Sequence, residues 1–164
     1  MNIATEKLLF EDDGLIPNNP RLPARVYRGA LQGPRDLEKV ARELFDGNAW
    51  PAAWTNGVFS YWHYHATAHE ALGVVSGEAR LGLGGESGSE VDVSAGDVVL
   101  IPAGVGHKRL SASPDFSVVG AYPPGQSPDM KTGRPEEHGP ALQSIAEVPD
   151  PQSDPVFGES VPDD

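Results

Sequence analysis

Between residues 58 and 122 the chain consists of short apolar segments, each closed by a turn rich in glycine, serine or proline. Apolar segments of four to eight residues favour β-strands, because helices need longer periodic stretches. The whole sequence holds 19 glycines and 16 prolines, which suits many tight turns and few helices. The pattern predicts an all-β sandwich or barrel. The predicted strands are residues 58–65, 70–76, 78–84, 90–94, 97–101, 107–112 and 116–122.

The segments on either side of this region are predicted to pack against it. Residues 1–49 hold two short edge strands, "KLLF" and "ARVYRGAL", and one helix at about 35–46 whose apolar side chains share a face. Residues 123–164 carry nine of the sixteen prolines and have the acidic composition of a disordered tail. This extension also holds apolar residues that could pack on the barrel. We therefore expect one structural domain, with a barrel over residues 50–122 and a Pro-rich C-terminal extension.

The charge and composition exclude several classes of partner. The formal net charge is −12, so phosphate backbones and anionic membrane surfaces would repel the protein, and we expect neither nucleic acid nor membrane as a partner. The sequence has no cysteine, so any metal site must be built from nitrogen and oxygen ligands. No basic segment followed by an apolar core opens the sequence, and no apolar run approaches membrane-spanning length. We expect a cytoplasmic location.

Three of the five histidines lie within seven residues, in the stretch "HYHATAHE". His63 and His65 are two residues apart, so on a strand both imidazoles point to the same side and could bind one ion. Glu70 has the wrong parity to continue that face, so a turn in "ATA" must bring it back beside the two histidines. His107 opens another predicted strand after a Gly-rich turn and could face the same interior. The alternative is a histidine-rich strand that faces solvent.

At these residues the sequence resembles the cupin superfamily. The first cupin motif corresponds, with every spacing met, to Gly57, His63, His65, Glu70 and Gly77. The second motif corresponds to Gly96, Pro102, Gly104 and His107, with Ser111 where the family has asparagine. The flanking stretches "YHATAHE" and "GAYPPGQ" are similar to single-domain bacterial cupins of the YjlB type. The resemblance covers roughly residues 50–122.

The resemblance implies a double-stranded β-helix, or jelly roll, with a metal site inside the barrel. The ligand set of the family falls on His63, His65, Glu70 and His107. Three imidazoles and a carboxylate suit one divalent transition metal per chain, either Fe(II), Mn(II), Ni(II), Co(II) or Zn(II), and suit Ca(II) or Mg(II) poorly. Four protein ligands on an octahedral ion leave two positions open for a small molecule. The alternative is a cupin that has kept these residues and binds no metal.

Residues on the same strand faces as the histidine ligands are predicted to line the pocket. We name Tyr61 and Arg109 as candidate catalytic residues, since each lies two positions from a histidine of the ligand set. An arginine buried there needs an anionic partner, which would favour a small organic acid as the ligand. Alternatively, Arg109 reaches the rim and pairs with a surface carboxylate. His69 is expected on the opposite face from Glu70. The aromatic residues interpreted as packing residues are Trp50, Trp54, Trp62 and Tyr64.

Three functions are compatible with such a site. The first hypothesis is an enzyme with dioxygenase-type chemistry at the 3-His/1-Glu centre. The second is a non-redox isomerase or lyase in which the metal acts as a Lewis acid. The third is a non-catalytic module that binds or senses a small molecule. In each case we expect a homodimer, because the edge strands of a small jelly roll need cover and twofold dimers are the commonest soluble oligomers.

Overall fold

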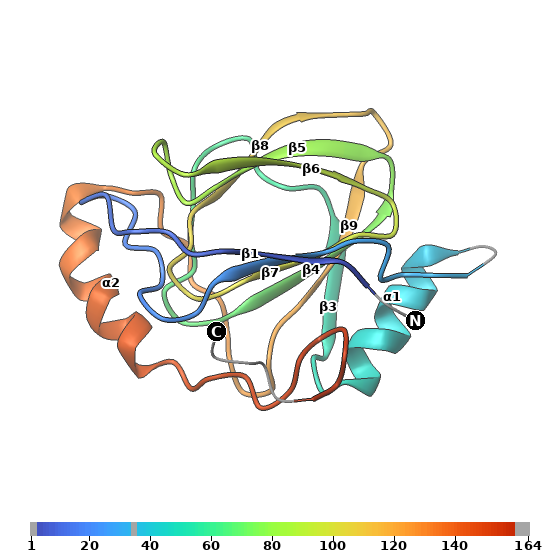
Figure 1. Ribbon diagram of the computed structural model, residues 1–164. Coiled ribbons are helices and arrows are strands. Elements are labelled where there is room, and N and C mark those ends of the chain that lie inside the picture. Colours follow the sequence, from blue (N-terminus) through green and yellow to red (C-terminus); the bar gives the residue numbers. More distant parts are fainter. Residues whose placement is uncertain (1–2, 34–35, 160–164) are drawn as a thin grey trace.

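The computed structural model describes residues 3–33 and 36–159 and consists of two antiparallel β-sheets that face each other (Figure 1). The larger sheet has six strands in the order β1 (Thr5–Leu8), β2 (Ala24–Tyr27), β7 (Val98–Ile101), β4 (Glu70–Ser76), β9 (Ser117–Ala121) and β3 (Ala52–Asn56). The smaller sheet has three strands in the order β6 (Ser89–Ser94), β5 (Glu78–Leu83) and β8 (His107–Ala112). The predicted all-β jelly roll is confirmed.

Side chains from both sheets meet in one apolar core. In β6, Val91 and Val93 are buried while the residues beside them are exposed, as expected of a strand with one face on the core. Leu72 and Val74 of β4, in the opposite sheet, belong to the same buried cluster. Every residue of β7 is buried, because one of its faces contacts this core and the other lies under helix α1 and the segments near it.

Two predicted strands differ from the structure. Segment 58–65 is not a regular strand, since within it His63 forms an isolated bridge to β8 and Tyr64 one to Lys131. A bend at residues 66–67 turns the chain before a ladder can extend. The regular strand in this part of the sequence is β3, which precedes the segment, pairs with β9 and was not predicted. The interpretation of β2 as an edge strand is wrong, because β1 pairs with its outer side.

The predicted N-terminal helix is α1 (Leu37–Gly47), while position 35, its predicted start, lies outside the described residues. Asp36 caps the helix, since its carboxylate accepts a backbone N–H of the first turn at 3.3 Å. Phe45 is buried against the outer face of the larger sheet. A Cβ at Gly73 would lie 3.2 Å from the Phe45 ring, so this close approach of helix and sheet depends on a glycine.

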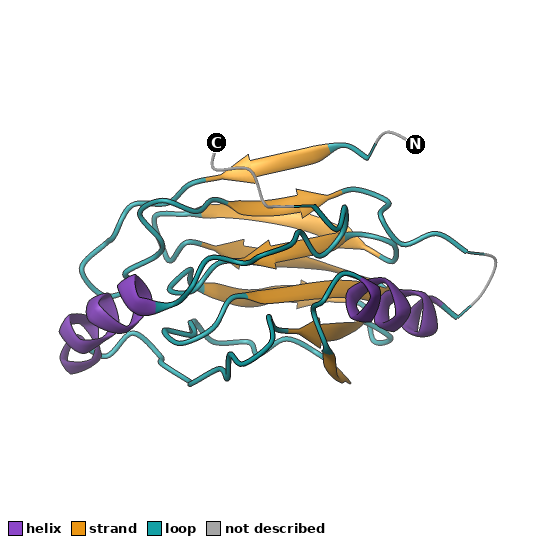
Figure 2. Cartoon of the chain, turned by 90° about the horizontal axis from the view of Figure 1, so that it is seen from below, coloured by secondary structure: helices purple, strands orange, loops and turns teal. Residues whose placement is uncertain are grey.

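A second helix, α2 (Pro135–Glu147), lies in the C-terminal extension and was not predicted. Gly139 and Pro140 lower its intrinsic helix propensity, which hides the helix in the sequence. Packing overrides this propensity, because Ala141 and Ile145 are buried in a cluster with Tyr64. The two helices lie at opposite ends of the sheets (Figures 1 and 2). Neither described helix is long and apolar enough to cross a membrane.

Residues 153–157 of the C-terminal extension are held to the N-terminal part of the chain by hydrogen bonds. Tyr27 donates its hydroxyl proton to Asp154 at 2.6 Å, and the Trp50 indole donates to the backbone oxygen of Ser153 at 2.9 Å. The other oxygen of Asp154 accepts two backbone N–H groups, from Val156 and Phe157. The buried carboxylate thus has three donors, as a charge removed from water requires.

Tyr27→Phe is expected to lower the free energy of unfolding by about 1–3 kcal/mol, because Asp154 loses one of its donors in a buried site. Urea unfolding followed by tryptophan fluorescence measures the change. Tyr64→Phe is the matched control, since Tyr64 is equally buried but its hydroxyl has no hydrogen-bond partner among the described residues. We expect the control to change stability by less than about 0.5 kcal/mol. Equal losses in the two variants would contradict a stabilising role for the Tyr27–Asp154 bond.

Candidate metal centre

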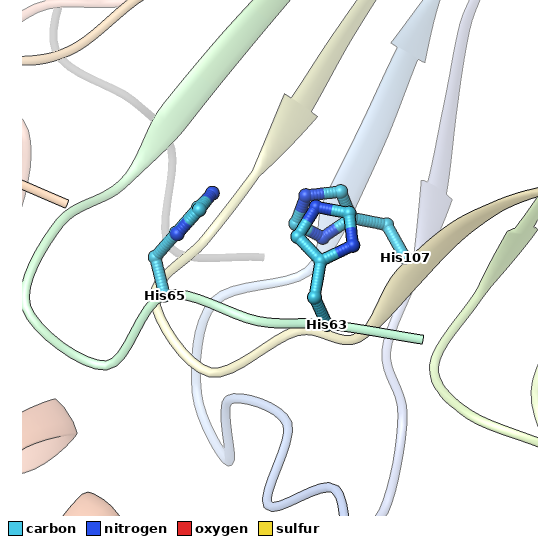
Figure 3. A group of neighbouring side chains, drawn as sticks. All are labelled: His63, His65 and His107. Carbon is cyan, nitrogen blue, oxygen red and sulfur yellow. The ribbon is translucent and has the colours of Figure 1, made fainter. Parts of the chain in front are cut away.

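Four buried side chains from separate parts of the sequence meet at the end of the barrel. His63 and His65 lie in the segment that leads into β4, Glu70 is the first residue of β4, and His107 is the first residue of β8. One ring nitrogen from each of the three histidines lies within 4.8 Å of the others (Figure 3). Oε1 of Glu70 lies 3.5 Å from Nε2 of His65 and 3.4 Å from Nε2 of His107. The residues named from the sequence are thus brought together, and metal binding by them stays a prediction.

The backbone orients all three imidazoles in the same way. Nδ1 of His63 lies 3.1 Å from the carbonyl oxygen of Tyr61, and Nδ1 of His107 lies 3.1 Å from that of Val105. Nδ1 of His65 lies 2.5 Å from the backbone oxygen of Asp129. A carbonyl oxygen only accepts, so each Nδ1 must carry the proton and donate it. With the proton on Nδ1, Nε2 is the atom that each ring can offer to an ion, which is the arrangement that metal-binding histidines adopt.

The charges in the cluster favour a cation. Burial and, to a smaller extent, the nearby His107 lower the pKa of His63 to about 3, so His63 is neutral at pH 7. Burial alone would raise the pKa of Glu70, but hydrogen bonds with His107 and His65 outweigh it and lower that pKa, so Glu70 is a carboxylate. Burial alone would lower the pKa of His65, but Glu70 outweighs it and raises that pKa. A divalent ion could take the place of the proton that Glu70 and the histidines share.

The spacing of the ligand atoms fits a single transition-metal ion. Two ligand atoms that each lie about 2.1 Å from one ion are roughly 3.0–3.4 Å apart for octahedral to tetrahedral angles. The Nε2 to Oε1 separations of 3.5 Å for His65 and 3.4 Å for His107 are close to that range. The donor set is three neutral nitrogens and one carboxylate, which suits first-row transition metals better than Ca(II) or Mg(II). The residues present therefore fit the metal that the motifs imply.

Tyr122 contacts the cluster and Trp54 contacts Tyr122, and neither role was recognised from the sequence. Tyr122 donates its hydroxyl proton to Oε2 of Glu70 at 3.0 Å, and Trp54 donates its indole proton to the Tyr122 hydroxyl at 2.8 Å. Both residues line the cavity, so the interpretation of Trp54 as a packing residue alone is incomplete. Ala71 pairs with Ala121 between β4 and β9, which sets Tyr122 beside Glu70. This register is the signal that could have identified Tyr122, and it is not visible in the sequence.

A cavity of about 550 Å³ opens from the cluster to the surface. Phe59 and Tyr61 are 50% and 46% exposed and stack at its mouth, with ring centroids 5.0 Å apart. Arg109 is half-buried on the wall and has no ion-pair partner among the described residues. The alternative, a pairing of Arg109 with a surface carboxylate, is therefore not seen among the described residues. Tyr61 and Arg109 both lie on the cavity, and their catalytic roles stay predictions.

His69 faces away from the cluster and has a structural environment. Its Nδ1 accepts the backbone N–H of Ala103 at 2.9 Å, and its Nε2 donates to the backbone oxygen of Pro149 at 3.1 Å. Burial lowers the pKa of His69 to about 4, so the ring is neutral, as these two bonds require. The side chain joins the loop before His107 to the C-terminal extension and does not reach the cavity.

Two solved structures have distant similarity to the chain. A DUF861 family protein from Thermotoga maritima is 17% identical with a TM-score of 0.35, over 73% of this chain and 97% of that one. The DMSP lyase DddQ from Ruegeria pomeroyi is 18% identical with a TM-score of 0.37, over 82% of this chain and 53% of that one. Both similarities are too weak to assign a function, and the family assignment depends on sequence.

Two sequence matches are much closer. Residues 54–115 match the cupin domain family. Over 162 residues the sequence is 43% identical to the uncharacterized protein YjlB of Bacillus subtilis (strain 168), a match that covers 99% of this chain and 96% of YjlB. The histidines and the glutamate of the two motifs lie together at the end of a jelly roll. The chain therefore belongs to the cupin superfamily, in the type represented by YjlB.

Proposed function

We propose that the protein is a metal-dependent enzyme that acts on a small organic anion, with dioxygenase-type chemistry as the first candidate reaction. The observation that carries this proposal is the common orientation of the three imidazoles, which directs three Nε2 lone pairs and one Glu70 oxygen toward one place. When its imidazoles are neutral, such a buried group holds more acceptors than donors. A cation satisfies this excess, because unpaired acceptors in a buried site are costly.

The donor set supports one ion of Fe(II), Mn(II), Ni(II), Co(II) or Zn(II) per chain, held by His63, His65, Glu70 and His107. When bound, a redox-active ion would supply activation of O₂, and a redox-inert ion would supply Lewis acidity.

The residues of the cavity account for binding and orientation. The guanidinium of Arg109, which has no described carboxylate partner, would bind a carboxylate of the substrate in a two-pronged geometry. The stacked rings of Phe59 and Tyr61 would cover an apolar part of the substrate at the mouth. Val58 and Leu72 line the interior and exclude water from the ligands. The substrate class that fits is a small organic acid with an apolar portion.

Metal content and oxygen consumption test this function. The protein is purified without a histidine tag, its metals are measured by elemental analysis, and an oxygen electrode follows its reaction with a panel of small carboxylic acids. Iron together with acid-dependent oxygen uptake would support the dioxygenase. Turnover without oxygen uptake, with zinc or nickel bound, would instead assign a non-redox isomerase or lyase. Binding without turnover would assign a binding or sensing module, and absence of metal and of binding would contradict all three.

Arg109→Gln is expected to weaken binding of a small carboxylic acid by about 10- to 100-fold, the range for loss of a charged hydrogen-bond partner. The metal content should not change, because Arg109 lines the cavity wall and is not part of the metal cluster. Benzoate titrated into the Co(II)-loaded protein, followed by visible absorption, measures the effect. Arg80→Gln is the control, since Arg80 pairs with Asp92 on the protein surface. Equal benzoate affinity in the Arg109 variant and the parent would contradict the anion-binding role of Arg109.

Tyr61→Phe should keep the metal and change turnover only.

The homodimer and the cytoplasmic location stay predictions. The outer positions of β1 and β3 in the larger sheet and the exposed side chain of Leu110 on β8 support a homodimer. Light scattering should then give about twice the chain mass of 17.4 kDa, and the mass of a single chain would contradict the dimer. Cell fractionation would test the location.

A further inference from the structure

Glu70 presents its two carboxylate oxygens to different partners. Oε1 lies 3.5 Å from Nε2 of His65 and 3.4 Å from Nε2 of His107, within the cluster. Oε2 instead accepts the hydroxyl proton of Tyr122 at 3.0 Å. Glu70 is only 3% exposed, and Tyr122 is the side-chain donor that the described residues supply to Oε2. Oε1 therefore faces the histidines of the cluster, while the hydrogen bond with Tyr122 holds Oε2.

The hydrogen bonds beyond Glu70 have only one possible direction. Nε1 of Trp54 lies 2.8 Å from the Tyr122 hydroxyl, and an indole nitrogen can only donate. The hydroxyl oxygen of Tyr122 thus accepts from Trp54, and its single proton is left for Oε2 of Glu70. We call this arrangement the Trp54–Tyr122–Glu70 network.

The network runs across three neighbouring strands of the larger sheet. Trp54 lies on β3, Tyr122 directly follows β9, and Glu70 begins β4, and these strands are adjacent in the order β4-β9-β3. Gly120 of β9 pairs with Trp54, and a Cβ at this glycine would lie 2.3 Å from the indole ring. The indole can therefore lie flat across β9 and reach Tyr122 only because residue 120 has no side chain.

We propose that Tyr122 is a positioning residue that holds Glu70 as a ligand through one oxygen, with Trp54 and Gly120 fixing the direction of the Tyr122 donor. This inference rests on the metal site proposed above. A carboxylate whose second oxygen is bonded to a phenol occupies one coordination position, whereas a free carboxylate can occupy two. Tyr122 thus keeps a position available for an exogenous ligand, and its function differs from that of a residue that only stabilises the fold.

Tyr122→Phe tests this role on the Co(II)-loaded protein. Without its donor, Oε2 of Glu70 should turn toward the ion and fill a position. The visible absorption of Co(II) reports coordination number, so the spectrum should change, and the affinity for azide should fall by about 10-fold or more. Trp54→Phe and Gly120→Ala should cause smaller changes in the same direction, since both leave the phenol in place. Circular dichroism establishes that each variant is folded.

The chain offers a closely matched control in Trp62. Its indole lies over Gly82, where a Cβ would come within 2.8 Å of the ring, and its Nε1 donates to Glu86 at 2.7 Å, outside the cluster. Trp62→Phe and Gly82→Ala should leave the Co(II) spectrum and the azide affinity unchanged.

The outcomes separate this inference from the proposed function. If the parent protein binds no Co(II), the metal site is wrong and the inference falls with it. If the parent binds Co(II) but a folded Tyr122→Phe has the same spectrum and azide affinity, the positioning role alone is wrong. The positioning role is also wrong if the control variants Trp62→Phe and Gly82→Ala change the Co(II) spectrum as much as Trp54→Phe does. Should Tyr122→Phe fail to fold, unchanged spectra in folded Trp54→Phe and Gly120→Ala would also overturn it.

Discussion

Replacing His107 with alanine is expected to lower the affinity for Zn(II) by about 100-fold or more. Loss of a residue that merely hydrogen-bonds to a metal ligand already costs about 10- to 100-fold, and loss of the ligand itself should cost at least as much. Nε2 of His107 lies 3.4 Å from Oε1 of Glu70, and His107 is one of the three histidines in the cluster. Glu70→Gln should act in the same direction, because a carboxamide is a poor anionic ligand. Competition with a chromophoric chelator measures both affinities.

The control for this loss is His138→Ala. Nε2 of His138 lies 2.8 Å from both carboxylate oxygens of Asp12, away from the cluster, so its removal should leave the Zn(II) affinity unchanged. Circular dichroism checks that each variant is folded. If a folded His107→Ala binds Zn(II) as tightly as the parent, His107 is not a metal ligand and the metal site proposed here is wrong.

Gly104→Ala is expected to lower the free energy of unfolding by about 2–4 kcal/mol. Residue 104 has φ of +90°, and a Cβ there would lie 2.5 Å from the backbone oxygen of Asn18. The backbone on both sides is tightly held, because Asn18 bonds to the carbonyl of Gly104 at 3.0 Å and to the N–H of Gly106 at 3.1 Å. Because this turn leads directly into His107, Zn(II) affinity should fall as well. Urea unfolding and Zn(II) titration measure the two effects.

Gly125→Ala separates backbone strain from steric clash. Residue 125 has φ of +79°, but a Cβ there would meet nothing within 4 Å. This variant should therefore show only the strain of the left-handed region, about 1 kcal/mol. A loss as large as that of Gly104→Ala would mean that the contact with Asn18 is not the cause.

The candidate ligands could be predicted because their placement depends on local rules. The alternation of side chains put His63 and His65 on one face, and the five-residue interval to Glu70 required a turn, which the structure has at residues 66–67. This reasoning held although the segment is not a regular strand, since an extended chain alternates its side chains whether or not a ladder forms. His107 was placed through the motif and the start of a strand, and β8 does begin there.

The residues that hold Glu70 could not be predicted because they depend on register between distant strands. Tyr122 lies beside Glu70 only because Ala71 pairs with Ala121, and a shift of one residue would turn its side chain to the other face. The contact of Trp54 with Tyr122 could not be predicted for a related reason, since β3 was not recognised as a strand. Helix α2 could not be predicted because Gly139 and Pro140 lower the helix propensity of this segment. Burial of Ala141 and Ile145 outweighs that low propensity in the folded protein.

The bond between His65 and the backbone of Asp129 has a consequence for biosynthesis. The ring donates to a carbonyl 64 residues further along the chain, and His69 beside it donates to Pro149. Proteins are made from the N-terminus, so His65 and Glu70 emerge from the ribosome before Asp129 and Tyr122, which orient them. A nascent chain that ends near residue 120 would hold the complete motif and still lack the geometry. The proposed binding of an ion would thus require the finished polypeptide and not the growing one.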